Sequence, residues 1–150
     1  MNKDLFFVGL QFLLFAAYFM DFPLLDFTLP TWIGYCCLAM FILGVVIIIL
    51  GIVSLNDNIT PFPTPKKSSD LISNGIYGLI RHPIYSGIFL SMFCYALYSG
   101  SGFRLLVAAL MLLVFYYKSD YEESLLLARY KRYQSYKEKT GRFFPKKSSR

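Results

Sequence analysis

The sequence predicts an all-α integral membrane protein with about four transmembrane helices and a cytoplasmic C-terminal helix that extends from the last span. The first observation is composition: 56% of the residues are hydrophobic and 16% are charged, against roughly 45–50% and 25% in soluble domains. The second is patterning, because the apolar residues gather in four runs, 5–20, 32–55, 84–99 and 103–117. A single soluble unit of 150 residues could not bury this much apolar surface.

The distribution of charge is the third observation. Residues 118–150 contain ten Lys or Arg and four Asp or Glu, a net charge of +6, whereas 1–117 contain five of each. A neutral apolar body with a basic tail is typical of a membrane protein whose tail meets anionic lipid. Nucleic-acid binding is the other interpretation of a basic tail, and the apolar body argues against it. The expected partners are therefore membrane lipids and no nucleic acid, and the sequence does not indicate the oligomeric state.

The first two runs are interpreted as spans. The run 5–20 has the length of a signal-peptide core, but no small-residue cleavage site follows it, so we expect an uncleaved first span. The run 32–55 has no charge over 24 residues. At about 1.5 Å per residue it is roughly 36 Å long, enough to cross a hydrocarbon core of about 30 Å with some tilt.

The second half of the chain predicts a cytoplasmic loop and a helical hairpin. Residues 56–74 are rich in Pro, Ser and Asn and predict an irregular loop. The runs 84–99 and 103–117 are shorter than the roughly 20 residues of a full span, and Gly100-Ser101-Gly102 between them predicts a tight turn. A half-inserted hairpin is the alternative to two complete spans. Helical spacing over 118–139 predicts that the last helix continues into the cytosol.

Loop charges predict the orientation. With four spans, the loop 21–31 and the turn 100–102 lie on one side, with only Arg104 among the basic residues near them. The other basic residues lie at the N-terminus, in the loop 56–83 and in the tail. The positive-inside rule makes that side cytoplasmic and places both termini there.

Residues 75–87 contain polar groups where a plain membrane helix would have none. Arg81 and His82 interrupt an apolar run, and Pro83 suits the first turn of a helix. A helix N-terminus beside a cation and the only histidine predicts a binding corner for a carboxylate or phosphate. Gly87 lies one turn further on and would let a flat ring approach the backbone. The alternative is that Arg81 and His82 only contact lipid headgroups.

Residues 120–123 form the second polar segment. Glu122 shares a helical face with Leu126, Tyr130 and Tyr133. A carboxylate on that face needs a cation, and Lys118 at i−4 is the ordinary candidate.

The two segments together offer Arg81, His82 and a helix N-terminus for a carboxylate, and a glutamate for an ammonium or sulfonium. Tyr77 and Tyr85 could stack on a base or face a cation. S-adenosylmethionine carries all of these groups. The three cysteines form no metal-ligand pattern, so no metal is expected.

Three blocks in this half of the chain are similar to those of a known superfamily. They are G-x-Y-x-x-x-R-H-P-x-Y-x-G at 75–87, E-E-x-x-L at 122–126 and Y-x-x-Y-x-x-x-T-G-R-x-x-P at 133–145. In this order and spacing they resemble the isoprenylcysteine carboxyl methyltransferase and phospholipid methyltransferase superfamily. The chain lacks the additional spans of the eukaryotic carboxyl methyltransferases and has Arg129-Tyr130 where many members have F-G. It is therefore similar to the short bacterial members.

The resemblance implies an integral-membrane enzyme that uses S-adenosylmethionine, releases S-adenosylhomocysteine and methylates a lipophilic acceptor. The acceptor would be a prenylcysteine-like carboxylate, a thiol or a lipid amine, and its identity is not indicated. The implied setting is the bacterial cytoplasmic membrane, or the endoplasmic reticulum for a eukaryotic chain. The implied cofactor-binding residues are Tyr77, Arg81, His82, Pro83, Tyr85, Gly87, Glu122 and Glu123, and the implied catalytic residues are His82 and Arg142.

This assignment makes 1–150 one methyltransferase domain. Its expected parts are two N-terminal spans (1–55), a cytoplasmic loop (56–74), a cofactor-binding catalytic half (75–145) and a basic tail (146–150).

Two other functions fit parts of the sequence. Membrane sterol reductases resemble the H-P-x-Y-x-G block and use NADPH, but they are far longer and differ at Glu122 and Glu123. A non-catalytic membrane protein with a basic docking tail explains composition and charge alone. The docking function requires Lys146 and Lys147, whereas the methyltransferase requires His82.

Overall fold

The computed structural model describes the chain except for residues 1–2, 21, 66–69 and 147–150. The described residues form α-helices and no strand, as predicted. The α-helices are α1 (Lys3–Phe19), α2 (Thr31–Leu55), α3 (Pro83–Ser99), α4 (Gly102–Arg129) and α5 (Tyr133–Lys139), with short 3-10 helices η1 (Asn56–Asn58) and η2 (Gly75–Gly78).

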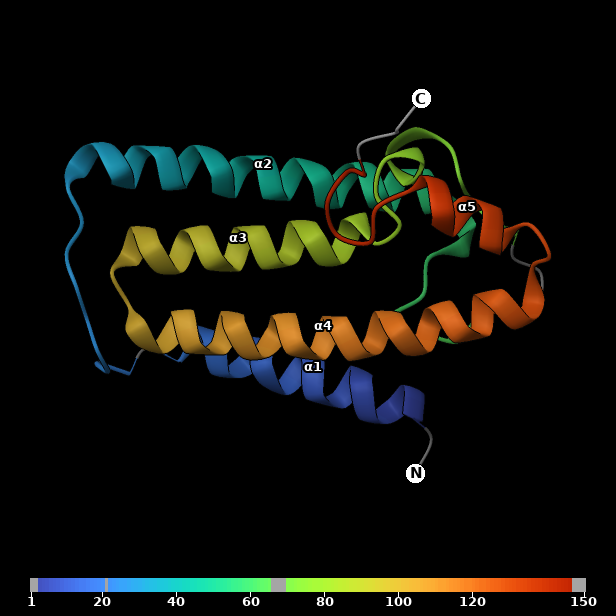
Figure 1. Ribbon diagram of the computed structural model, residues 1–150. Coiled ribbons are helices and arrows are strands. Elements are labelled where there is room, and N and C mark those ends of the chain that lie inside the picture. The colour runs from blue at the N-terminus through green and yellow to red at the C-terminus, as the bar shows by residue number, and fades with distance from the viewer. Residues whose placement is uncertain (1–2, 21, 66–69, 147–150) are drawn as a thin grey trace.

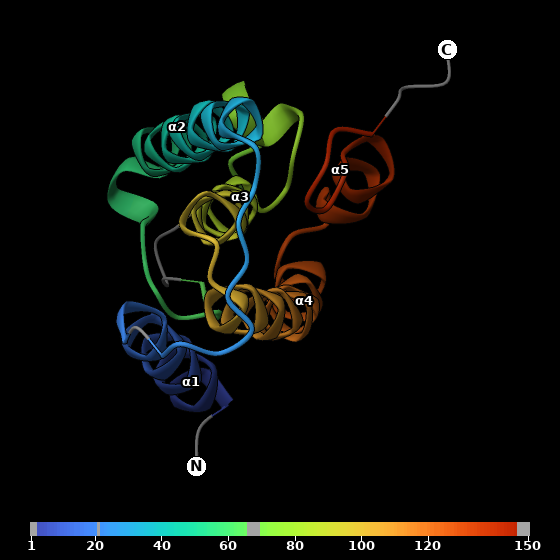
Figure 2. The ribbon, with the colours of Figure 1, turned by 90° about the vertical axis from the view of Figure 1, so that its left-hand side faces the viewer.

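Helices α1 to α4 run side by side with alternating direction (Figure 1). Viewed along their axes, α3 lies between α2 and α4, and α1 packs against α4 (Figure 2). The short helix α5 lies at the end of the bundle where α3 begins. The described residues of the loop 56–74 and of the segment after α5 also reach this end. The polar part of the molecule therefore lies here.

The predicted helical hairpin is confirmed. Gly100 ends α3 with a left-handed backbone (φ +67°), which glycine adopts without strain. Ser101 caps α4, because its side chain accepts a hydrogen bond from the Arg104 backbone N–H. The helices on either side start and stop within one residue of the apolar runs, apart from the C-terminal extension of α4.

The predicted continuous helix over 118–139 is wrong in one place. α4 extends as far as Arg129, but Tyr130 has an extended backbone and caps the helix end. The chain turns over residues 130–132 before α5 begins. The sequence keeps its helical spacing across this break. The break goes with contacts between the following segment and the start of α3, and local spacing does not encode such contacts.

Two helices among the described residues are long and apolar enough to cross a membrane, α2 and α4. In the most apolar part of α2 only 17% of the residues are buried, whereas the core helix of a soluble protein would be mostly buried. The outward face of α2 is therefore apolar, as a lipid-facing helix requires. Helices α1 and α3 have 17 residues each, short of a full crossing, so four complete spans stay a prediction.

Glycines bring α2 and α3 into backbone contact. A methyl group built on Gly44 would lie 2.8 Å from the carbonyl oxygen of Gly87, and one built on Gly87 would lie 2.6 Å from the carbonyl oxygen of Gly44. Small residues let helices in membranes approach this closely. The opposite side of α3 packs on α4, where Met111 and Phe115 are fully buried. α3 is thereby held on both sides.

We expect Gly44→Ala to lower the thermal midpoint of the detergent-purified protein by several degrees. The added methyl group would also collide with Ser91 Oγ, and overpacking of this kind costs about 1–3 kcal/mol. The matched control is Gly9→Ala, because nothing lies within 4 Å of a methyl group at Gly9. Equal midpoints for the two variants would contradict the close contact of α2 and α3.

Candidate active site

The segment after α5 returns to the start of α3. The backbone N–H of Arg81 donates to the Gly141 carbonyl oxygen at 2.8 Å, and that of His82 donates to the Arg142 carbonyl oxygen at 3.1 Å. Ile80 and Gly141 form an isolated parallel bridge. These contacts place the side chains of Arg81 and His82 among α3, α4 and α5.

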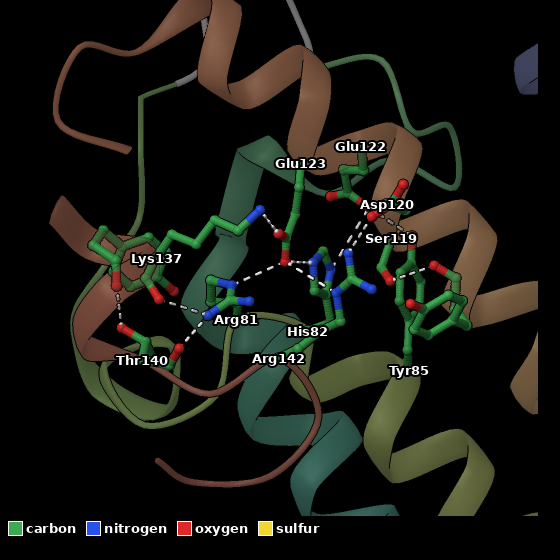
Figure 3. A network of polar contacts seen from close by, with 12 residues as sticks. Arg81, His82, Tyr85, Ser119, Asp120, Glu122, Glu123, Lys137, Thr140 and Arg142 are labelled. Carbon is green, nitrogen blue, oxygen red and sulfur yellow. Dashed lines mark hydrogen bonds and ion pairs between the residues drawn. The ribbon is translucent and has the colours of Figure 1, made fainter. Parts of the chain in front are cut away.

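The Glu123 carboxylate lies at the centre of this end of the bundle, with 1% of its side chain exposed (Figure 3). Its Oε1 accepts from Arg81 Nε at 2.9 Å and from Arg142 Nε at 3.4 Å, and lies 3.2 Å from His82 Nε2. Its Oε2 lies 2.9 Å from Lys137 Nζ. One buried carboxylate is thus paired with basic groups from three parts of the chain, which compensates its burial.

Arg81 connects this cluster to the C-terminal segment. Besides Glu123, its guanidinium donates to the backbone oxygens of Lys137, at 3.0 Å, and Thr140. Only 8% of its side chain is exposed. Arg81 therefore holds α5 and the returning segment against α4.

Arg142 points toward the outer side of α4. Its Nη2 lies 2.7 Å from Asp120 Oδ1, and its guanidinium lies 5.0 Å from the centre of the Tyr116 ring. Burial alone would lower the pKa of Arg142, but the hydrogen bond that it donates to Asp120 and the charge of Glu123 outweigh burial and raise the pKa. Arg142 lines neither of the two cavities described below.

Glu122 faces a different environment from its neighbour. Its Oε2 accepts from the Tyr85 hydroxyl at 2.9 Å and lies 3.8 Å from His82 Nδ1. About a quarter (26%) of its side chain is exposed. The expected partner Lys118 donates instead to Gln11 Oε1 at 2.7 Å and to the Pro61 carbonyl oxygen at 2.9 Å.

Stacked rings hold the histidine in place. The His82 ring lies 5.4 Å from that of Tyr85 at an interplanar angle of 3°, and Tyr85 stacks on Phe115 at 4.7 Å and 10°. Phe115 is fully buried in the bundle. The core therefore fixes the plane of the imidazole, while the tyrosine hydroxyl fixes Glu122.

Two cavities meet at this cluster. One, of about 300 Å³, lies among α1, α2, α3 and α4, and the other, of about 110 Å³, lies between residues 58–65 and 70–72 on one side and the α4–α5 region on the other. Four of the predicted cofactor-binding residues line both cavities: Tyr77, Arg81, His82 and Glu122. Tyr85 lines the larger cavity only. These residues form a shared wall between two compartments.

The structure places two predicted site residues elsewhere. Pro83 is the first residue of α3, as expected, and is buried against α2 near Gly51. The close approach expected at Gly87 is made by the Gly44 carbonyl oxygen of α2. Neither Pro83 nor Gly87 lines the two cavities.

Sequence reasoning did not include Tyr133 among the site residues. It lines the smaller cavity with 1% exposure, and its hydroxyl has no hydrogen-bond partner among the described residues. Burial raises its pKa well above the usual range, so the hydroxyl keeps its proton. The sequence did indicate this residue, because its helical spacing puts Tyr133 on the same face as Glu122, Leu126 and Tyr130. All four residues line this cavity despite the break between α4 and α5.

Tyr136, one turn beyond Tyr133, has a structural contact. Its hydroxyl donates to the Tyr77 carbonyl oxygen at 2.6 Å. Burial, opposed by the charge of Arg81 and supported by that of Glu123, raises the pKa of Tyr136 to about 12. The phenol therefore stays protonated and holds α5 on η2 at neutral pH.

The basic tail has one described contact. Lys146 Nζ donates to the Glu138 carbonyl oxygen at 2.7 Å. Lys147 and the rest of the tail lie outside the described residues.

We expect Glu123→Gln to destabilise the protein strongly. The variant leaves Arg81, Arg142 and Lys137 around a neutral amide, and removing one partner from a buried ion-pair network costs about 3–5 kcal/mol. The measurement is the thermal midpoint in detergent, with Glu138→Gln as the matched control, because Glu138 is exposed and bonds Gln134. A midpoint as high as that of the control would show that Glu123 does not organise this end of the bundle.

Comparison with protein families identifies the chain. A family model described as phospholipid methyltransferase matches residues 32–133, from α2 to the first residue of α5, and so includes Arg81, His82, Glu122 and Glu123. Comparison with curated proteins finds no match. The family and the two apolar helices make this a membrane protein of methyltransferase type. The chain belongs to the phospholipid methyltransferase family, within the isoprenylcysteine carboxyl methyltransferase superfamily.

Proposed function

We propose that the chain is an S-adenosylmethionine-dependent methyltransferase that acts at the membrane–cytosol interface on a lipophilic acceptor. One observation carries the proposal: Tyr77, Arg81, His82 and Glu122 line both cavities. Transfer between two ligands requires two compartments that meet at the reacting atoms. The cavity toward the loop and α5 suits the cofactor, and the cavity among the helices suits an acceptor that arrives from the lipid.

The residues of the smaller cavity fit the cofactor. Glu122 supplies a carboxylate for its ammonium, and the unpaired hydroxyl of Tyr133 supplies a buried hydrogen bond. Arg81 and His82, the N-cap residue of α3, line this cavity and are the basic side chains available to its carboxylate. Tyr77 and Tyr130 offer aromatic faces to the purine.

The two adjacent glutamates have separate roles in this proposal. Glu123 is enclosed by basic groups and lines neither cavity. Glu122 lines both cavities, and a neutral hydroxyl is its closest partner. We therefore assign the cofactor's ammonium to Glu122 and a structural role to Glu123.

When bound, the cofactor would supply a methyl group on a sulfonium; the acceptor would bond to this methyl carbon as its bond to sulfur breaks, and S-adenosylhomocysteine would be the leaving group. The chain's residues mainly align the two ligands and exclude water. A carboxylate or thiolate acceptor needs no base. An amine acceptor must lose a proton, and His82 Nδ1 is the available group because Nε2 is held by Glu123. S-adenosylhomocysteine is the product.

The arrangement of the helices supports the proposed location. The beginning of α1 and the whole of α5 lie at the end of the bundle that carries the site (Figure 1). We propose that this end faces the cytosol, with both termini there, and that α1 and α3 complete four spans with the help of interfacial residues. The bacterial cytoplasmic membrane is the proposed setting.

We expect wild-type protein in detergent to bind S-adenosylhomocysteine in a saturable manner by isothermal titration calorimetry. Glu122→Gln should weaken this binding by roughly tenfold or more, because a hydrogen bond to a charged group is worth about 1.5–3 kcal/mol. Glu138→Gln, on the exposed face of α5, should bind as wild type does. Absence of binding by folded wild-type protein would refute the proposed function and favour a non-catalytic membrane protein.

We expect Tyr133→Phe to raise the dissociation constant of S-adenosylhomocysteine by roughly 2–10-fold, the worth of one neutral hydrogen bond. Its thermal midpoint should not fall, because the hydroxyl has no partner within the described chain. Tyr136→Phe, which loses the bond to Tyr77, should lower the midpoint. Unchanged affinity in Tyr133→Phe would remove Tyr133 from the proposed cofactor site.

A further inference from the structure

The larger cavity contains a buried lysine. Lys118 projects from α4, has 1% exposure and lines this cavity together with Ile52, Ile84 and Ile88. An ammonium in apolar surroundings is costly unless an opposite charge accompanies it. Lys118 is therefore a residue whose position calls for an anion.

Among the described residues, the hydrogen-bond partners of Lys118 are neutral. Its ammonium donates to the amide oxygen of Gln11 and to the carbonyl oxygen of Pro61, and lies 5.2 Å from the centre of the Tyr85 ring. Among the described residues, no carboxylate lies within ion-pair distance of it. An ammonium has three hydrogens, so one remains for a ligand. Glu122 and Asp4 act on this charge only through attraction beyond ion-pair distance, so within the described chain Lys118 has no ion pair of the kind that surrounds Glu123.

Lys118 lies beside the proposed transfer site. The Tyr85 ring under its ammonium carries the hydroxyl that bonds Glu122, and Glu122 follows Lys118 by one helical turn. A ligand group held at Lys118 is thus adjacent to the wall between the two cavities. The cofactor is not the partner of Lys118, because Lys118 does not line the smaller cavity.

A second apolar cavity continues the path along α3. It has a volume of about 320 Å³ and lies between α1 and α2, with Phe15, Phe41 and Met92 in its lining. Phe15 follows Gln11 by one turn of α1, and Met92 follows Ile88 by one turn of α3. The two cavities therefore lie along the same faces of these helices. A chain that starts at Lys118 can extend along this path.

We propose that Lys118 binds the anionic group, a phosphate or a carboxylate, of the lipophilic acceptor, whose apolar chain lies along α3 between α1 and α2. This inference rests on the proposed methyltransferase function, because it names the substrate class of the same site. It makes Lys118 a specificity-determining residue. The acceptor atom then lies toward His82 and Glu122, away from the hydrocarbon chain.

The test measures binding without cofactor. Wild-type protein in dodecyl maltoside is titrated with dodecyl phosphate, laurate and dodecanol by calorimetry, with the micelle blank subtracted. We expect at least one of the two anions to bind tenfold or more tightly than dodecanol. Preference for dodecyl phosphate points to a phospholipid acceptor, and preference for laurate points to a carboxylate acceptor; either supports the site. No preference for an anion in wild-type protein overturns the proposal without any variant.

Three variants assign the preference to Lys118. Lys118→Met should abolish the preference and leave dodecanol binding unchanged, whereas Lys118→Arg should retain it. Gln11→Leu is the matched control, because it removes a neutral partner of Lys118 and keeps the charge, so its preference should persist. A preference that survives in Lys118→Met, or that Gln11→Leu loses to the same extent, would show that Lys118 only joins α1 to α4.

Titration of the same samples with S-adenosylhomocysteine separates the two proposals. Binding of S-adenosylhomocysteine without any anion preference would refute the role of Lys118 and leave the methyltransferase in place. Anion preference without S-adenosylhomocysteine binding would refute the methyltransferase and leave an anionic-lipid site.

Discussion

The pairing of the Glu123 carboxylate with surrounding basic groups is the interaction on which the rest of the site depends. Arg81 precedes α3, Lys137 lies on α5 and Arg142 follows α5, yet all three reach this one side chain. The carboxylate also holds Nε2 of His82, so the orientation of the imidazole follows from the same charge. The end of the bundle that carries the candidate site is thus organised around the buried Glu123 carboxylate rather than around an apolar core.

Glu122 and Glu123 are adjacent on α4, yet their side chains meet different surroundings. Successive residues on a helix point about 100° apart, so Glu122 and Glu123 meet different neighbours. Glu123 faces basic groups that neutralise it, whereas Glu122 faces a phenol and two cavities. The rings of Phe115, Tyr85 and His82 stack on one another. Because Phe115 is buried in the core, this stack fixes Tyr85, whose hydroxyl holds Glu122. The position of Glu122 in the candidate site therefore depends on the packing of the helix core.

Much of this fold was predictable because long apolar runs in the sequence indicate helices of membrane type. The hairpin turn at Gly100 and the start of α3 at Pro83 follow from residues with strong backbone preferences. The sequence grouped Tyr77, Arg81, His82 and Glu122, which the structure brings to one shared wall, but it did not indicate how these side chains are arranged. The break at Tyr130 and the pairing of Glu123 with Lys137 and Arg142 involve α5 and the segment after it, which are remote from α3 in sequence. The partner of Lys118 on α1 is 107 residues away in sequence, and no local pattern indicates such a contact.

The return of the C-terminal segment to α3 also sets an order of assembly. The backbone of residues 141–142 bonds that of Arg81 and His82, and chains are made from the N-terminus at a finite rate. Helices α1 to α4 can therefore pack together before the segment that completes these contacts has left the ribosome. Until it arrives, Glu123 lacks Lys137 and Arg142, and the wall between the two cavities is unsupported. This end of the bundle is thus completed only after residue 142 has been synthesised, later than the helices against which the segment packs.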